Sequence, residues 1–218
     1  MSLYQNNQQD LFPKRFLLVL LFISIFTNIY LLAKFQYPNI IHTIQVALLP
    51  APKVLPTDHV RGRTDAKYTV IAYTDFQCPF CSQLHGAMTE IMQEADVRWV
   101  YRHFPLPGHK FAAKAAEASE CAGEQGKFWE YSDALFALKG QMTGSSFMQI
   151  AQDLGLDWVA FGMCLGTGKN TSAVAAQYDD GIKNKITGTP TFYVNNKRFD
   201  GFVPLEDLRK LVGVKAGK

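Results

Sequence analysis

Two cysteines that stand three residues apart, Cys78 and Cys81, follow directly on a stretch with the composition of a buried strand. That stretch, Tyr68 to Thr74 (YTVIAYT), is β-branched and aromatic without clean alternation, as expected of a strand covered on both faces of a sheet. Beyond Cys78, apolar residues recur at helical spacing as far as Glu94, and Pro79 suits a first helical turn, where its missing N–H costs no hydrogen bond. The chain is therefore predicted to pass from a buried strand through the cysteines into a helix.

The rest of the predicted domain alternates strands with a long helical segment. Val97 to Phe104 (VRWVYRHF) reads as a second strand, and the resulting strand–helix–strand unit implies parallel pairing. Residues 110–185 carry helical patterns and are interpreted as an inserted helical subdomain. Strand signals return at Thr191 to Val194 and at Arg198 to Val203, and Pro204 opens a terminal helix. The predicted fold class is α/β with a helical insertion.

An uncharged apolar run precedes this domain, from Phe16 to Ala33. At 1.5 Å per residue it spans roughly 27 Å, close to the hydrocarbon core of a bilayer, and it is predicted to be a single transmembrane helix. A cleaved secretory signal is the alternative, although the apolar core of a signal is usually shorter and ends in small residues. Lys14 and Arg15 precede the run while only Lys34 closely follows it, which favours a cytoplasmic N-terminus. Both alternatives export the domain.

These patterns divide the chain into four parts. Residues 1–15 are predicted to form a short cytoplasmic tail, disordered over its polar stretch at 2–10, and residues 16–33 the signal-anchor helix. Residues 34–60 contain four prolines and are predicted to be a linker, with the catalytic domain at 61–216. The net charge of +3 is spread along the chain, so it indicates no nucleic-acid partner.

Two cysteines at a helix start are suited to thiol–disulfide exchange. Their spacing places both sulfurs on one helical turn, while unpaired N–H groups and the helix dipole stabilise a thiolate on the first. Cys78 is therefore the predicted nucleophile, and Cys81 is the resolving thiol that attacks the mixed disulfide and releases the substrate. A zinc half-site or a plain structural disulfide is an alternative, but no second CxxC motif or histidine pair completes a zinc site.

Two further alternatives remain open. Cys78, Cys81 and His85 stand at i, i+3 and i+7 on one face of the predicted helix, which is compatible with a soft-metal site and a copper-handling protein. The domain is alternatively a binding module that keeps only the fold, an interpretation that the intact CxxC motif disfavours. No bound cofactor or resident metal is predicted under the redox interpretation.

Several separate motifs carry a family resemblance. YTDFQCPFC, FPLPGH, GKFWEYSDALF and GTPTFYVNNKRFDG resemble the DsbA-type branch of thioredoxin-fold oxidoreductases over about residues 61–214. The resemblance implies a thioredoxin fold with a helical insertion. It also implies that Pro190 is a cis proline lying against the active-site disulfide, and that Thr189 offers its main chain to the substrate. From GTPTF alone, an ordinary trans proline opening a buried strand fits equally well.

Three further positions lie close to the cysteines in sequence. Pro79 and Phe80 lie between the cysteines and, with Thr189, help to set the reduction potential. Asp75, three residues before Cys78, occupies a position that is acidic in many relatives, which makes it a candidate proton relay for Cys81. A turn or N-cap role for Asp75 fits equally, because aspartate readily accepts hydrogen bonds from helix-start amides.

The other two cysteines, Cys121 and Cys164, lie in the helical insertion. If Cys78 and Cys81 pair with each other, an exported chain is expected to oxidise the remaining two when they are close, and we predict a structural disulfide. Two buried free thiols acting as small hydrophobes are the alternative.

The function predicted from these features is oxidation of exported proteins through a Cys78–Cys81 redox-active pair. As the resemblance implies, its partners are reduced or unfolded exported proteins and a membrane protein that reoxidises the pair. The chain is expected to be a single-pass protein of the cytoplasmic membrane with a periplasmic catalytic domain. Disulfide isomerase or reductase activity stays open, because the same geometry serves both directions of electron flow.

Overall fold

The computed structural model describes residues 11–37 and 49–214, which fall into two compact units divided between Leu49 and Pro50. The predicted disordered stretch at 2–10 and the linker residues 38–48 lie outside the described residues. The described residues of the first unit form the helix α1, from Leu11 to Gln36, whose segment Arg15–Phe35 is long and apolar enough to cross a membrane. A signal sequence near the N-terminus can pass the same test of length and apolar composition, so this helix is compatible with both alternatives raised by the sequence.

The second unit is built on a five-stranded mixed sheet with the strand order β1-β3-β2-β4-β5. The strands are β1 (His59–Arg61), β2 (Tyr68–Thr74), β3 (Val97–His103), β4 (Thr191–Val194) and β5 (Lys197–Asp200). β2 and β3 pair in parallel, as the strand–helix–strand unit predicts, and the other pairs are antiparallel. The central position of β2 explains why its sequence shows no polar alternation, since both of its faces are covered.

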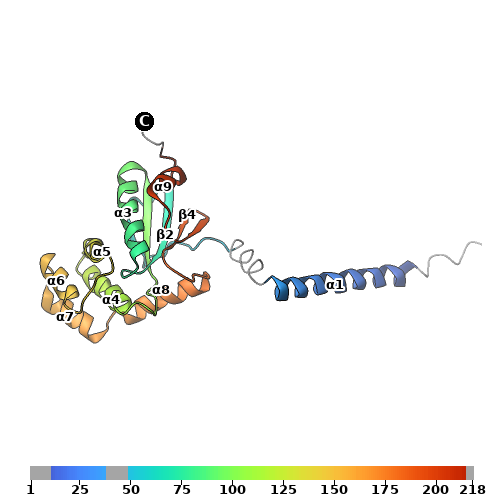
Figure 1. The fold of residues 1–218 in the computed structure, drawn as a ribbon, viewed down its shortest axis with the longest axis horizontal. Coiled ribbons are helices and arrows are strands. Elements are labelled where there is room, and N and C mark those ends of the chain that lie inside the picture. Colours follow the sequence, from blue (N-terminus) through green and yellow to red (C-terminus); the bar gives the residue numbers. More distant parts are fainter. Residues whose placement is uncertain (1–10, 38–48, 215–218) are drawn as a thin grey trace, which may run out of the picture. The chain divides into compact units, whose positions relative to one another are not determined.

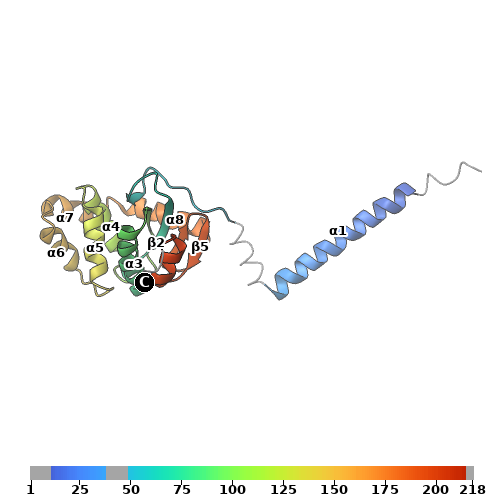
Figure 2. The ribbon, with the colours of Figure 1, turned by 90° about the horizontal axis from the view of Figure 1, so that it is seen from above.

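Seven helices follow the cysteines within the described residues. They are α3 (Pro79–Glu94), α4 (Ala112–Gly123), α5 (Phe128–Ala137), α6 (Ser146–Asp153), α7 (Trp158–Thr167), α8 (Thr171–Lys183) and α9 (Leu205–Leu211). Figures 1 and 2 show α4 to α7 gathered at one end of this unit, beside the sheet. The helical insertion predicted between the strands is therefore present, and the predicted α/β class is confirmed.

The two faces of the sheet bury different helices. Val70 and Ala72 of β2 point to the face covered by α3 and α9, whereas Ile71 and Tyr73 point to the opposite face, which α8 covers. This separation follows from the two-residue repeat of a strand. A third core fills the insertion and reaches the cysteines, since Cys78 and Cys81 pack in the same cluster as Tyr131 and Phe161. The insertion thus packs directly against the two cysteines.

Two segments differ in extent from the predicted ones. The linker was predicted to reach residue 60, but residues 50–60 belong to the compact unit, where Ala51, Val54 and Val60 pack against the α8 face of the sheet. Prolines exclude a helix there, but they do not prevent an extended segment from packing. The last strand was predicted at Arg198 to Val203 but ends at Asp200, because Gly201 follows with a φ of +86° and turns the chain away.

Candidate active site

The candidate active site is the turn between β2 and α3. The Cys78 N–H donates to the Asp75 carbonyl at 3.1 Å, and the Gln77 N–H donates to Asp75 Oδ1 at 2.7 Å, which shapes the chain into a tight turn. Cys78 is the N-cap residue of α3 and has extended backbone angles, and Pro79 occupies the first turn. The Cys81 N–H and the Ser82 N–H both point back to the Cys78 carbonyl. Local sequence thus places the first cysteine at the positive end of a helix.

Cys78 carries a stabilised thiolate. Its pKa is lowered to about 6, chiefly by a hydrogen bond from the Cys81 thiol. Burial opposes this shift, while the backbone N–H groups of Cys81 and Phe80 lower the pKa further. At neutral pH the sulfur of Cys78 is therefore mostly an anion, which is the form of a thiol that takes part in exchange.

Cys81 has the opposite character. It is fully buried, and burial is the largest cause that raises its pKa well above the usual range. The thiolate of Cys78 raises that pKa further, because two adjacent negative charges repel each other. The Asp75 N–H, which points to the Cys81 sulfur at 3.5 Å, opposes this shift only in part. The pair thus consists of one thiolate and one neutral thiol that donates to it.

A second loop meets the cysteines from far along the chain. The Thr189–Pro190 peptide bond is cis, and the Thr189 carbonyl lies 3.4 Å from the Cys78 sulfur. Pro190 leads directly into β4, so the central part of the sheet sets the position of this loop. Between the cysteines, the Phe80 side chain is 56% exposed and offers an apolar surface beside Cys78. The predicted loop residues are therefore assembled around one sulfur.

Asp75 is held in the turn by several donors. Its side chain is fully buried, and Oδ2 accepts from the Leu106 N–H at 2.8 Å and faces His109 Nδ1 at 2.7 Å. With the Gln77 bond, the turn role considered for Asp75 is present, and its role in proton transfer stays a prediction. Sequence reasoning gave His109 no role, although it belongs to the FPLPGH motif on which the family resemblance partly rests.

The alternative metal site is not assembled. His85 Nε2 lies 2.7 Å from Asp133 Oδ1, and the His85 ring stacks on Phe136 with 4.4 Å between ring centroids. Within residues 11–37 and 49–214, no group of three or more histidine, cysteine, aspartate and glutamate side chains could hold a metal ion. Helical spacing put His85 on the same face as the cysteines, but tertiary packing directs its ring toward α5.

The remaining cysteines form a disulfide. Cys121 and Cys164 are bonded at 2.03 Å and join α4 to α7, so they are not free thiols. Both are buried in the core of the insertion.

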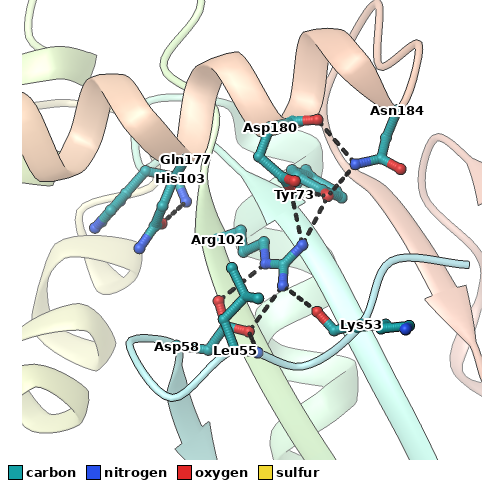
Figure 3. A network of polar contacts seen from close by, with 9 residues as sticks. All are labelled: Lys53, Leu55, Asp58, Tyr73, Arg102, His103, Gln177, Asp180 and Asn184. Atoms are coloured by element: carbon teal, nitrogen blue, oxygen red, sulfur yellow. Dashed lines mark hydrogen bonds and ion pairs between the residues drawn. The ribbon is translucent and has the colours of Figure 1, made fainter.

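A buried arginine ties three elements of the unit together (Figure 3). Arg102 of β3 is 1% exposed and makes bidentate contact with Asp58, whose side chain is equally buried. The same guanidinium donates to Asp180 of α8 at 2.8 Å and to the Lys53 carbonyl at 2.6 Å. Sequence reasoning missed this network, because its members are scattered along the chain.

A second carboxylate, which is partly buried, lies in α4. Glu120 faces His59 and His103, each at 2.9 Å. Burial alone would raise the pKa of Glu120, but the hydrogen bonds to His103 and His59 outweigh it and lower the pKa to about 2. The contacts of Glu120 with His59 and His103 are separate from the contact between Asp75 and His109.

Comparison with known proteins gives one family. The family model described as thioredoxin matches residues 54–213. Among solved structures, a thioredoxin-like oxidoreductase from Silicibacter pomeroyi DSS-3 has 27% identity and a TM-score of 0.64, with 73% of this chain and 92% of that chain covered. DsbA2 from Pseudomonas aeruginosa has 26% identity and a TM-score of 0.60, with 73% and 95% covered.

Curated relatives are longer proteins. A Na(+)/H(+) antiporter NhaA 1 from Salinispora arenicola is 39% identical over 157 residues, which are 71% of this chain and 24% of that protein. The chain thus spans about a quarter of the length of this relative.

Proposed function

This chain belongs to the thioredoxin family and is an oxidoreductase, and from that premise we propose that it introduces disulfides into exported proteins through Cys78 and Cys81. The observation that carries the proposal is the pairing of a thiolate at Cys78 with a buried neutral thiol at Cys81, beside the Thr189 carbonyl. Such asymmetry suits an exchange centre, in which one sulfur meets the substrate and the other stays shielded.

The reaction begins from the Cys78–Cys81 disulfide. A substrate thiolate attacks the Cys78 sulfur, the disulfide breaks, and its electron pair leaves with Cys81, which takes up a proton. A second substrate thiolate then attacks the substrate sulfur of the mixed disulfide, and Cys78 leaves as a thiolate. The substrate dithiol is oxidised to a disulfide, and the enzyme pair is reduced to a dithiol. The low pKa of Cys78 favours the second step, because a thiolate of low pKa is a good leaving group.

Direction of electron flow depends on the reduction potential. A pKa of about 6 for Cys78 lies between the values of roughly 7 for thioredoxin and roughly 3.5 for DsbA. We therefore place the potential between about −270 mV for thioredoxin and about −120 mV for DsbA. Isomerase or reductase activity is the second candidate, since this pKa is closer to that of thioredoxin than to that of DsbA.

The potential decides between these candidates. The full chain in detergent is equilibrated in graded glutathione buffers, quenched with acid and alkylated, and the oxidised fraction is read by mass spectrometry. A midpoint clearly more oxidising than about −230 mV supports an oxidase or isomerase, and a midpoint near about −270 mV refutes the oxidase assignment. Oxidative refolding of a reduced protein with several disulfides then separates an oxidase from an isomerase that acts only on scrambled disulfides.

The second proposal concerns location. We propose that α1 anchors the domain to the cytoplasmic membrane as a single-pass helix, with the catalytic domain in the periplasm and a membrane protein as its reoxidising partner. The apolar segment Arg15–Phe35 and the charges at Lys14 and Arg15 support this orientation. Two experiments on the producing cells test this proposal. The chain should stay in the membrane fraction on alkaline extraction. Its catalytic domain should be digested by added protease only after the outer membrane is permeabilised. Release in alkali would show that the N-terminal segment is cleaved.

A further inference from the structure

Gln77, the residue before the first cysteine, is held by its main chain and by its side chain. Its N–H donates to Asp75 Oδ1 at 2.7 Å, which closes the turn after β2. Its side-chain Oε1 accepts from the Phe111 N–H at 2.7 Å, and Phe111 is the N-cap residue of α4. Its carbonyl oxygen lies against Gly140, in the loop between α5 and α6. The helical insertion therefore contacts Gln77 from two separate segments.

The contact with Gly140 is too close for any side chain at that position. A Cβ atom at Gly140 would lie 2.6 Å from the Gln77 carbonyl oxygen, a separation that packed Cβ atoms do not reach. Gly140 has a φ of +81°, and the preceding Lys139 has a φ of 50° although it is not glycine. Left-handed backbone at a residue with a side chain costs free energy and persists where the surrounding structure fixes it. This loop thus brings its backbone directly onto the residue that precedes Cys78.

A second link to the insertion lies on the other side of the cysteine pair. Ser82, the residue after Cys81, donates its hydroxyl hydrogen to the Phe136 carbonyl at 2.9 Å. Phe136 belongs to the last turn of α5 and therefore precedes the loop that contains Gly140. The residues immediately before and after the CPFC motif are thus both bound to the helical insertion.

The position of Gln77 determines where the sulfur of Cys78 lies. Cys78 is the N-cap residue of α3 with extended backbone angles, and its backbone continues directly from the Gln77 carbonyl. The Cys81 thiol and the N–H groups of Cys81 and Phe80 lower the pKa of Cys78 only while the sulfur stays next to them. Burial raises that pKa, so a sulfur that moves away from its donors but stays buried becomes less acidic. A small rotation of the chain at Gln77 is therefore enough to change the acidity of Cys78.

We propose that Gln77 is a positioning residue through which the helical insertion holds the Cys78 sulfur against the first turn of α3. The start of α4 and the α5–α6 loop fix Gln77, and Gln77 fixes the backbone of Cys78. This inference rests on the proposed exchange activity and deepens it, because it gives the insertion a part in setting the reduction potential.

The first test adds one methyl group at Gly140. G140A pushes a Cβ atom against the Gln77 carbonyl, and it also places alanine at a left-handed φ. G155A is the matched control, because Gly155 lies in the α6–α7 loop with a φ of +68°, where a Cβ atom would meet no atom of the described residues within 4 Å. Both variants therefore carry the same kind of backbone strain, but only G140A disturbs Gln77.

The measurement is the pH dependence of Cys78 alkylation. Each reduced variant, as the full chain in detergent, is treated with iodoacetamide between pH 4 and pH 9, and mass spectrometry of the Cys78 peptide gives the extent of modification. We expect the pH of half-maximal alkylation to rise by at least about half a unit in G140A, because the thiolate loses part of its donors. G155A should keep the wild-type midpoint.

The second test removes the side-chain acceptor of Gln77. Q77M keeps a side chain of similar length but leaves the Phe111 N–H without this acceptor. Q125M is the matched control, because Gln125 Oε1 accepts at 2.9 Å from the N–H of Asp157, which is the N-cap residue of α7. Q77M should raise the alkylation midpoint as G140A does, and Q125M should not. In glutathione buffers, Q77M and G140A should both be more reducing than the wild type, because a less stable thiolate makes the reduced form less stable.

Urea denaturation of the four variants separates this role from a general loss of stability. Reduced stability alone leaves the alkylation midpoint unchanged, and it should occur in the controls as well. The inference is wrong if G140A or Q77M keeps the wild-type midpoint, or if a matched control shifts by as much as its partner variant. Should G140A not fold, Q77M and Q125M decide. Failure of the proposed function has a different signature, because it appears as a reducing potential of the wild-type chain itself.

Discussion

Removal of the Cys81 thiol should raise the pKa of Cys78. The hydrogen bond from Cys81 is the largest cause of the lowered pKa of Cys78, and burial opposes it. A hydrogen bond to a charged group contributes about 1.5–3 kcal/mol, and one pKa unit corresponds to about 1.4 kcal/mol. In C81A the pH of half-maximal Cys78 alkylation should therefore rise by roughly one to two pH units.

The assay is the rate of iodoacetamide alkylation of Cys78 in the full chain between pH 4 and pH 9. The midpoint in the wild-type chain should fall near pH 6, where the thiolate is half populated. C81S is the matched control, because its hydroxyl keeps a donor at the same place, and its midpoint should rise less than that of C81A. If C81A and C81S share one midpoint, the hydrogen bond is not the source of the acidity, and the helix terminus alone must supply it.

Three further predictions follow from the same contacts. As the pH rises, the reduction potential should fall by about 59 mV per pH unit below pH 6, because reduction there takes up two protons. Above pH 6 it should fall by about 30 mV per pH unit, because Cys78 stays ionised and only Cys81 is protonated. Titration in glutathione buffers from pH 5 to pH 8 measures both slopes. C121A/C164A should lower the free energy of unfolding by about 4 kcal/mol in the chain-entropy model, measured by urea denaturation, without a change in Cys78 alkylation. R102M should cost about 3–5 kcal/mol of unfolding free energy, because Asp58 stays buried without its partner, and D58N/R102M should recover part of this loss.

Features set by neighbouring residues could be predicted from the sequence. β2 coincides with the predicted strand Tyr68 to Thr74, and α3 ends at the predicted Glu94. These elements depend on local composition, on Pro79 at the helix start and on apolar periodicity, all of which lie within a few residues. Position within the sheet is also visible, since a strand without alternation must lie at its centre.

Features that depend on distant partners could not be predicted. In the sequence, Arg102 is one residue of a predicted strand. Its hydrogen-bond partners Lys53, Asp58 and Asp180 are 44 to 78 residues away from it along the chain. The contact of His109 with Asp75 could not be predicted either, because no residue near His109 in the sequence indicates that the Asp75 carboxylate lies beside it. The contacts of a loop histidine depend on which distant residues the fold brings next to it.

The segment 50–60, which was predicted to belong to the linker, shows what contacts between distant residues contribute. A domain that began at residue 61 would lose both Asp58 and the Lys53 carbonyl, and the buried guanidinium of Arg102 would keep only Asp180 and Tyr73 as partners. It would also lose most of β1, which covers the edge of β3. The segment 50–60 therefore completes the sheet as well as leading to the membrane segment. Because β3 pairs in parallel with β2, which carries the cysteine turn at its end, this segment stabilises the scaffold on which the exchange site is built.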